Sequence, residues 1–249
     1  MEIAAVVLAA GKGKRMGSEN GSEIPKVMFK ANGKPVVSYL IQSLCDAGLK
    51  KIVLVVGYKQ EIVRDYFKDQ VEYAVQEEQL GTGHATMSAR VNLEGKSDAV
   101  IVCCGDAPLF KPETIKNLID LYTNEKPTIA MLTVEYSDPT GYGRIIRNTE
   151  GNVDAIIEHK DCDEEQLKTT ECNPAFYVFD SLWLWKNLAN IKTNNTQGEY
   201  YLTDVIKMAK DQGKKISAVK IADETEVLGI NTPEQLQQVE NVLTSRIKN

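Results

Sequence analysis

Three loops of this sequence place glycine beside charged or amide side chains, each close behind a short apolar run. In residues 8–16 (LAAGKGKRM), two glycines permit a tight turn whose amides can approach an anion, and three cations surround it. Further on, Gln76 precedes a glycine-rich turn and can offer an amide to the edge of a base. Asp106 ends a third apolar run with a carboxylate. Taken singly, these features equally suit a surface loop or a turn cap.

The spacing of the first loop excludes the two commonest phosphate motifs. A Walker A loop needs GxxxxGK[ST], and a dinucleotide fingerprint needs glycine where Met16 stands. The loop opens a basic stretch, residues 11–34, in a chain whose net charge is −6. Charge alone favours a solvated surface for this stretch. The net negative charge argues against a nucleic-acid binder, which needs a basic face.

Strand-like and helix-like segments alternate through the first half of the chain. Val- and Ile-rich runs occupy residues 3–8, 52–56, 71–75, 99–103 and 128–134. Between these runs, the apolar spacing in residues 37–44 and 115–122 is that of one helical face. This alternation predicts an α/β fold with a largely parallel sheet covered by helices on both faces. Asp106 then lies at the carboxyl end of a buried strand, where open α/β sheets bind ligands.

The pattern changes after about Pro139. It predicts a hairpin (144–147 and 153–160), a strand (175–179), a helix (202–209), a strand (216–221) and a final helix from Thr232. That helix starts with a capping-box spacing and has Pro at its first position. Because the sequence has no linker and no internal repeat, we expect one domain, residues 1–249. Its expected parts are a nucleotide-binding half to about 135, an acceptor half at about 136–230 and a C-terminal helix at 231–249.

Composition places the chain among globular proteins, with 43% hydrophobic and 26% charged residues. Its five cysteines form no CxxC pair and no spacing typical of a metal site. The first apolar run follows Glu2 rather than a basic segment and is too short to cross a bilayer. We therefore expect a cytoplasmic protein with reduced cysteines, no export signal and no membrane segment.

The motifs together resemble those of the sugar-nucleotide pyrophosphorylases, and most closely the bacterial N-acetylglucosamine-1-phosphate uridyltransferases. Residues 8–16 match LxxGxGxRM, residues 79–85 match QLGTGHA, residues 138–144 match DPTGYGR and residues 194–204 match NNxQGEYYxTD. The resemblance runs from about residue 3 to residue 243. It implies a Rossmann-like, GT-A-like nucleotidyltransferase fold with a mixed, mostly parallel sheet. The implied reaction is the Mg²⁺-dependent transfer of UMP from UTP to N-acetylglucosamine 1-phosphate, with release of pyrophosphate.

The resemblance also implies a role for each matching residue. The catalytic cations would be Arg15 and Lys26, and the Mg²⁺ ligands would be Asp106 and Asn231. The nucleotide would be held by Leu8, Ala10, Gly11, Gly13, Gln76, Gly81 and Thr82. The sugar would be held by Gly143, Glu158, Asn173, Tyr201 and Thr203. We expect Glu158 and Lys160 to share one face of a strand, and His84 to pack or cap rather than catalyse.

Three features depart from the family pattern. Cys104 stands where relatives carry an aromatic residue, and Pro174-Ala175 replaces a small or Thr-Gly pair. Residues 17–24 are longer and more polar than expected, which suggests a flexible lid. These departures keep open another sugar 1-phosphate, such as glucose 1-phosphate. A non-catalytic sugar-nucleotide-binding or regulatory domain is the more distant alternative.

The relatives' hexapeptide-repeat acetyltransferase domain has no counterpart in this sequence. The chain is therefore expected to be naturally monofunctional or a shortened protein. We expect small-molecule substrates, no nucleic-acid or membrane partner, and a monomer or weak homo-oligomer.

Overall fold

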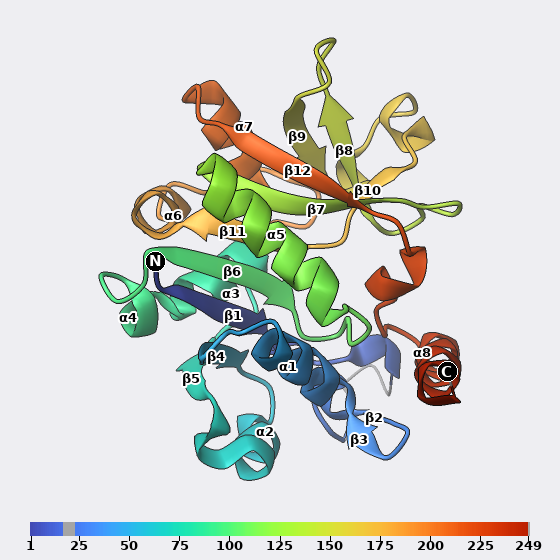
Figure 1. Ribbon diagram of the computed structural model, residues 1–249. Helices are drawn as coiled ribbons and strands as arrows, with labels where there is room; N and C mark the ends of the chain where they lie inside the picture. Colours follow the sequence, from blue (N-terminus) through green and yellow to red (C-terminus); the bar gives the residue numbers. More distant parts are fainter. Residues whose placement is uncertain (17–22, 249) are drawn as a thin grey trace.

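The structure, a computed structural model, describes residues 1–16 and 23–248. One ten-stranded sheet runs through it (Figure 1). The strand order is β5 (Glu72–Val75), β4 (Lys51–Val56), β1 (Ile3–Leu8), β6 (Ala99–Cys104), β11 (Phe176–Asp180), β7 (Ile129–Glu135), β10 (Glu171–Asn173), β8 (Gly143–Arg147) and β9 (Val153–Ile157), with β12 (Ile216–Ile221) paired to β7 off this path.

The first half of the sheet is parallel. Strands β5, β4, β1 and β6 pair in this order, and Leu8 of β1 is level with Val55 of β4 and Cys104 of β6. The carboxyl ends of these strands therefore meet at one edge. The loops after β1, β5 and β6 are the three glycine-bearing loops of the sequence, so all three start from this edge.

The second half of the sheet makes it mixed. Strand β11 runs antiparallel between β6 and β7, whereas β12 is parallel to β7. Strands β8 and β9 form the predicted hairpin, and β10 pairs antiparallel with both β7 and β8. The expectation of a mixed, mostly parallel sheet is confirmed.

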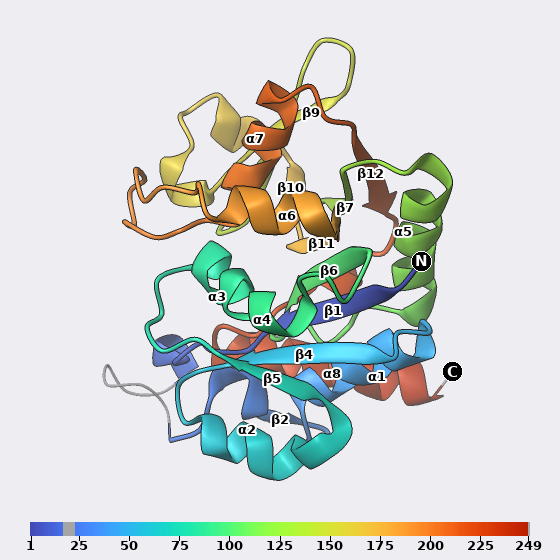
Figure 2. The ribbon, with the colours of Figure 1, turned by 90° about the vertical axis from the view of Figure 1, so that its left-hand side faces the viewer.

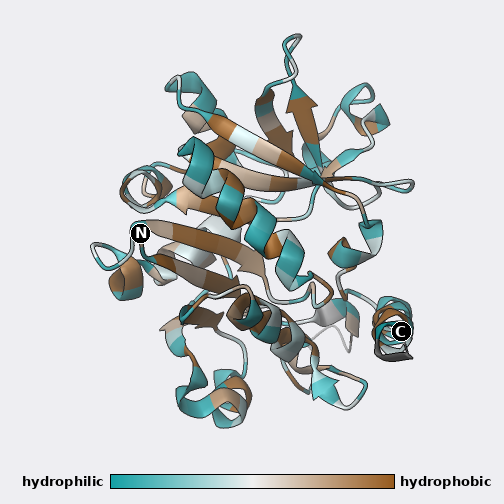
Figure 3. Cartoon of the chain, viewed as in Figure 1, coloured by the Kyte–Doolittle hydropathy of each residue, from teal (hydrophilic) through white to brown (hydrophobic). Residues whose placement is uncertain are grey.

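Helices cover both faces of the sheet (Figure 2). On one face lie α1 (Val36–Asp46), α2 (Gln60–Phe67) and α5 (Pro112–Glu125), and on the other lie α3 (Thr82–Ser88), α4 (Arg90–Leu93), α6 (Ser181–Leu188) and α7 (Asp204–Asp211). Alternate residues of β1 supply the two cores, Ala5 and Val7 to the first, Ala4 and Val6 to the second. The central strands β1 and β6 are accordingly apolar along their length, as expected for strands that are buried on both faces, whereas β8, β9, β10 and β12 carry charged residues (Figure 3).

The last helix, α8 (Pro233–Lys248), packs apart from these layers. Val239 and Leu243 join a small third core with Ala31 and Val36, beside the short hairpin of β2 (Lys30–Ala31) and β3 (Lys34–Pro35). The predicted start is confirmed, because Pro233 is the first helical residue. This packing holds the residues just before α8 against the first half of the sheet.

The sequence-based prediction was wrong at the end of the second hairpin strand. Strand β9 stops at Ile157, and His159–Asp161 form a 3₁₀ turn closed by a bond of 2.9 Å from Asp161 N to Glu158 O. This local bond replaces the strand ladder, so Glu158 and Lys160 do not share a strand face. Most of the expected lid at residues 17–24 lies outside the described residues. Within residues 1–16 and 23–248, no helix is long and apolar enough to cross a membrane.

Candidate active site

Four of the predicted site residues meet where the first loop faces the start of α8. Arg15 Nη2 donates to Asn231 Oδ1 at 2.8 Å. Lys26 Nζ donates to the same oxygen at 3.2 Å and also bonds and ion-pairs with Asp106 Oδ2. Residues more than two hundred positions apart in the sequence thus share one hydrogen-bonded cluster. Gly13, with φ of +63°, allows the loop to pass close to Lys26, because a Cβ at this position would lie 3.1 Å from Lys26 Cβ.

The oxygens of this cluster suit a hard divalent cation. Asp106 and Asn231 each direct one side-chain oxygen at a single cationic atom, Lys26 Nζ. Among the described residues, no group of three or more His, Cys, Asp or Glu gathers as a metal cage. Mg²⁺ commonly takes one or two protein oxygens and completes its shell with water and phosphates. The residues therefore fit Mg²⁺ that binds together with a phosphate ligand.

A hollow of about 230 Å³ extends from this cluster along the carboxyl edge of the sheet. Its lining includes most of the predicted nucleotide residues, namely Leu8, Ala10, Gly11, Gln76, Gly81 and Thr82, together with Lys26 and Asp106. Gln76 is 3% exposed, and its Nε2 lies 3.1 Å from both Gly81 O and His84 Nδ1. His84, which we expected to pack or cap rather than catalyse, contacts the Gln76 amide through this nitrogen.

The turn after Gln76 packs tightly against the second half of the chain. A Cβ at Gly81 would lie 2.6 Å from Tyr200 O, and its φ of +108° is a conformation that glycine tolerates best. Gly83 N donates to Tyr200 O at 2.7 Å, and Leu202 N donates to Thr82 Oγ1 at 3.0 Å. The segment that carries Thr203 is thereby fixed to the nucleotide side of the groove.

A smaller hollow of about 40 Å³ continues the groove and shares Leu8, Thr82 and Cys104 with the first. Glu158, Asn173 and Thr203, three of the predicted sugar residues, line it. Thr203 Oγ1 donates to Glu158 Oε1 at 3.0 Å. Burial raises the pKa of Glu158, and the hydrogen bond from Thr203 partly opposes that rise. Gly143 lies behind the carboxylate, since a Cβ there would be 3.5 Å from Glu158 Oε2.

The Pro174-Ala175 departure builds a turn that fixes Asn173. Ala175 N donates to Asn173 Oδ1 at 3.0 Å, and Tyr177 OH donates to the same oxygen at 2.8 Å. Because a backbone N–H can only donate, Oδ1 is the acceptor and the other amide atom, Nδ2, remains to donate. Ala175 adopts φ of +55°, which an L-residue other than Gly or Asn adopts at some cost. The Pro174-Ala175 turn therefore holds the side chain of Asn173 with Oδ1 as an acceptor inside the protein.

Tyr201, a predicted sugar residue, and Lys160 both contact Gln197 and line neither hollow. Tyr201 is 6% exposed, accepts a hydrogen bond of 2.8 Å from Gln197 Nε2, and is not among the residues that line either hollow. Lys160 Nζ donates to Gln197 Oε1 at 2.7 Å and so fastens the loop before Glu199 instead of pairing with Glu158.

Sequence reasoning missed several groove residues, among them Glu199, Gln79 and Tyr177. Glu199 and Gln79 lie inside recognised motifs, so motif membership was a signal that could have found them. Tyr177 carried no signal beyond strand periodicity. Cys104 lines both hollows. Burial is the main cause that raises the pKa of its thiol to about 12, and the negative charge of Asp106 adds to this rise, so the thiol stays protonated at neutral pH.

Comparisons with known proteins agree with this geometry. Residues 5–177 match the family described as MobA-like NTP transferase domain. The chain is 44% identical over 248 residues to the bifunctional protein GlmU of Clostridium perfringens, covering 99% of this chain and 53% of that protein. It is 44% identical over 243 residues to GlmU of Streptococcus agalactiae, covering 98% and 52%. The chain thus spans about half the length of these curated relatives.

Solved structures share the fold at low identity. A UDP-glucose pyrophosphorylase complexed with UDP-glucose superposes with a TM-score of 0.79 at 16% identity, covering 99% of this chain and 100% of that one. A putative glucose-1-phosphate thymidylyltransferase of Bacillus anthracis gives a TM-score of 0.79 at 18% identity, covering 96% and 94%. The Rossmann-like nucleotidyltransferase fold implied by the sequence is confirmed.

Proposed function

This chain belongs to the family of MobA-like NTP transferase domains, and we propose that it transfers UMP from UTP to N-acetylglucosamine 1-phosphate, forming UDP-N-acetylglucosamine and pyrophosphate. One observation carries the proposal. A hydrogen-bonded cluster lies at the head of the groove and consists of Arg15, Lys26, Asp106 and Asn231. From this cluster the groove continues through the larger hollow to the smaller one, which is lined by the carboxylate of Glu158. A cationic cluster at one end of the groove and two hollows that meet at Leu8, Thr82 and Cys104 suit a reaction that joins a nucleoside triphosphate to a second phosphate.

In this reaction the phosphate oxygen of the sugar attacks the α-phosphorus of UTP in line, and pyrophosphate departs. Arg15 and Lys26 neutralise the charge that develops on the α-phosphate and on the departing group. When bound to Asp106 and Asn231, Mg²⁺ supplies further charge neutralisation. Direct attack needs no covalent intermediate, and the raised pKa of the half-buried Cys104 thiol is consistent with a site that has no protein nucleophile.

The two ends of the groove select the substrates. Leu8, Ala10, Gly11 and Gly13 hold the phosphates against the first loop, and the amide of Gln76 with Gly81 and Thr82 reads the uracil. At the other end, Asn173 Nδ2 donates and Glu158 accepts, so together they take the donor and acceptor groups of a sugar. The walls of this end of the groove are supported by the contacts of Gly143, Tyr201 and Thr203.

A second candidate is the same chemistry with another sugar 1-phosphate, such as glucose 1-phosphate. It is favoured by Cys104 and Ala175, because both line the sugar-side hollow and both depart from the family pattern. A non-catalytic sugar-nucleotide-binding domain is disfavoured, since a binder has no need of the groups that handle a leaving pyrophosphate.

The test is pyrophosphate release from UTP with Mg²⁺, comparing N-acetylglucosamine 1-phosphate, glucose 1-phosphate and N-acetylgalactosamine 1-phosphate. We expect the first to give the highest kcat/KM. Preference for either of the others would move the sugar specificity and keep the chemistry. Binding of UTP without release in any combination would favour the binding domain.

We further propose that residues 1–249 act as one nucleotidyltransferase domain. Its ten-stranded sheet crosses the boundary expected near residue 135, and Asn231 before the last helix bonds to Arg15, so the nucleotide half, the sugar half at about 136–230 and the C-terminal helix cooperate in one site. For this function we propose only small-molecule partners, a cytoplasmic location, and a monomer or weak homo-oligomer.

A further inference from the structure

The first turn of α8 is joined to the groove by a hydrogen bond that helix capping does not require. Thr232 caps the helix, because Gln235 N donates to its Oγ1 at 3.3 Å. In a capping box, the side chain of Gln235 would in turn accept from Thr232 N. Instead, Gln235 Oε1 accepts from Asn231 N, one residue earlier, at 2.6 Å.

This bond is one of two that pin the backbone around Asn231. On the preceding residue, Ile230 N donates to Asp106 O at 2.9 Å. The Gly229–Ile230 peptide is thus fixed to the loop that carries Asp106, and the next peptide, Ile230–Asn231, is fixed to α8 through the nitrogen of Asn231. Only two side-chain torsions then separate this anchored backbone from Oδ1, the atom that meets Arg15 and Lys26.

We propose that Gln235 is a positioning residue for the metal site of the proposed reaction. By accepting from Asn231 N, it keeps the amide oxygen of Asn231 beside the carboxylate of Asp106. Gln235 itself contacts neither substrate nor metal. The inference rests on the proposed function in one respect, namely that these two oxygens bind a divalent cation together with the nucleotide.

Partners that orient a metal ligand commonly matter for affinity because a loosely held donor must be ordered when the cation binds. The competing explanation is that Gln235 only stabilises the start of α8. The chain offers variants that separate the two. Gln235→Met keeps the length and helix propensity but removes the acceptor, whereas Gln235→Glu keeps an acceptor. Thr232→Ala removes the cap and leaves the bond to Asn231 N.

A matched control lies two residues further along the same helix. Gln237 is exposed, and its Nε2 contacts only Asn241 Oδ1, at 3.4 Å, among the hydrogen bonds of the described residues. Gln237→Met therefore makes the same chemical change on α8 without touching the groove.

The experiment measures the binding of Mn²⁺ to the intact chain with UTP and without sugar phosphate, so that no turnover occurs. Mn²⁺ prefers the same oxygen donors as Mg²⁺ and is followed by its electron paramagnetic resonance. We expect Gln235→Met to weaken Mn²⁺ binding roughly tenfold or more, within the range known for outer-shell partners of metal ligands. Gln235→Glu, Thr232→Ala and Gln237→Met should bind Mn²⁺ like the unmodified chain, and thermal melting should show all four variants folded.

Wild-type binding of Mn²⁺ by a folded Gln235→Met variant would overturn the inference and leave the proposed function intact. An equal loss in Thr232→Ala would also overturn it, because helix capping would then explain the effect. If Gln235→Met does not fold, Gln235→Ala takes its place. A roughly tenfold loss of Mn²⁺ affinity in Gln235→Ala that is absent from Gln235→Glu supports the inference, and unchanged Mn²⁺ affinity in Gln235→Ala overturns it. Failure of the unmodified chain to bind Mn²⁺ with UTP would contradict the proposed function itself and remove the metal role of Asn231 with it.

Discussion

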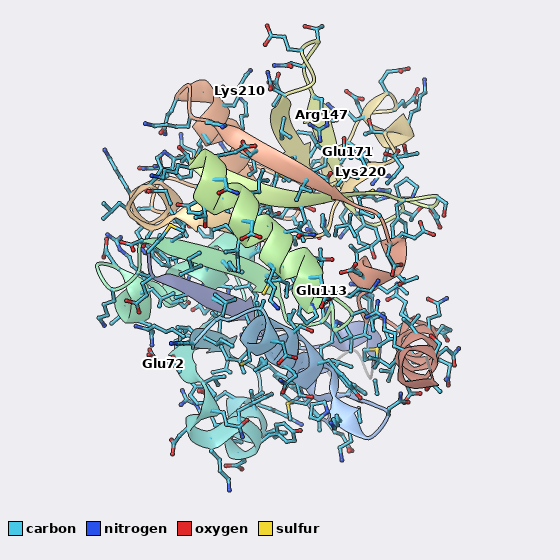
Figure 4. The ribbon with its side chains drawn as sticks, viewed as in Figure 1. Glu72, Glu113, Arg147, Glu171, Lys210 and Lys220 are labelled. Carbon is cyan, nitrogen blue, oxygen red and sulfur yellow. The ribbon has the colours of Figure 1, made fainter. Side chains whose placement is uncertain are left out.

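Two charged clusters of this protein are built on opposite principles. Over the second half of the sheet, Arg147 forms a two-pronged pair with Glu171, both bonds at 2.7 Å, and Lys220 pairs with Glu135 at 2.8 Å (Figure 4). Each cation there has its own carboxylate. At the head of the groove, Lys26 pairs with the one carboxylate, Asp106, whereas Arg15 and Lys26 both donate to one neutral amide oxygen, Asn231 Oδ1.

The two clusters differ in charge balance, and this difference distinguishes a structural role from a functional one. Hydrogen bonds from Lys220 and then from Thr170 lower the pKa of Glu135, as expected for a settled ion pair. Such surface pairs commonly contribute only about 0–1 kcal/mol to the free energy of unfolding. The groove cluster carries one more cation than the carboxylates that ion-pair with it among the described residues, and in the proposed function an anionic ligand, a triphosphate, would supply the missing charge.

The largest expected effect comes from removing the carboxylate of the groove cluster. Asp106→Ala should lower kcat for pyrophosphate release by roughly 10²–10³, the usual loss when one charge-stabilising group is removed. Circular dichroism should show the fold intact. Turnover near that of the unmodified chain would take Asp106 out of the mechanism.

A smaller effect is expected at the sugar end of the groove, where Glu158 accepts a hydrogen bond and does not neutralise charge. Glu158→Gln should raise KM for the sugar phosphate roughly ten- to a hundredfold, because a hydrogen bond to a charged group contributes about 1.5–3 kcal/mol. KM for UTP should stay the same. Equal increases in both constants would mean that Glu158 supports the whole groove and does not select the sugar.

The raised pKa of Glu158 adds a pH signature to the same residue. Because burial makes the proton of Glu158 harder to lose, this carboxyl group becomes protonated at a higher pH than an exposed glutamate does when the solution is acidified. KM for the sugar phosphate should therefore begin to rise above the ordinary glutamate pKa of about 4.3, and Glu158→Gln should abolish this dependence.

Tyr177→Phe should act more weakly and through another residue. It removes one of the two bonds to Asn173 Oδ1 and leaves the bond from Ala175 N. A neutral hydrogen bond contributes about 0.5–1.5 kcal/mol, so we expect KM for the sugar phosphate to rise by roughly two- to tenfold. An unchanged KM would show that the Asx-type turn alone orients Asn173.

The smallest effect on catalysis is expected in the balanced cluster. Arg147→Ala should lower the free energy of unfolding, measured by urea denaturation, by about 1–3 kcal/mol, since it leaves Glu171, whose side chain is only 12% exposed, without its charged partner. Its kcat should equal that of the unmodified chain. A large loss of turnover in a folded Arg147→Ala variant would contradict the distinction between the two clusters.

The sequence predicted the groove well where a motif carried both the residue and its neighbours. Arg15 and Asn231 were placed in one site although most of the chain separates them, because each sits in its own recognisable string. Strand order could not be read from periodicity, since β11 enters between β6 and β7 from far along the chain. The hairpin strand was extended too far, because the Asp161–Glu158 turn bond, which the sequence alone does not reveal, ends the ladder after Ile157.

Tertiary contacts explain the remaining differences. Tyr201 belongs to a matching motif, yet Gln197 and burial turn it away from the hollow. The effect of Pro174-Ala175 could not be judged from sequence, because the turn in which Ala175 N donates to Asn173 Oδ1 includes a positive φ at Ala175. Capping spacing at Thr232 was predicted correctly, but only the fold shows that Gln235 reaches back to Asn231.

The most direct test of the charge-balance distinction is the initial rate of pyrophosphate release by Lys26→Ala and by Lys220→Ala, measured side by side with Mg²⁺, UTP and N-acetylglucosamine 1-phosphate. Each substitution removes one lysine that is ion-paired with a carboxylate. We predict a loss of roughly 10²–10³ in kcat for Lys26→Ala and none for Lys220→Ala. Equal rates in the two variants would contradict the claim that the unbalanced cations of the groove serve the triphosphate.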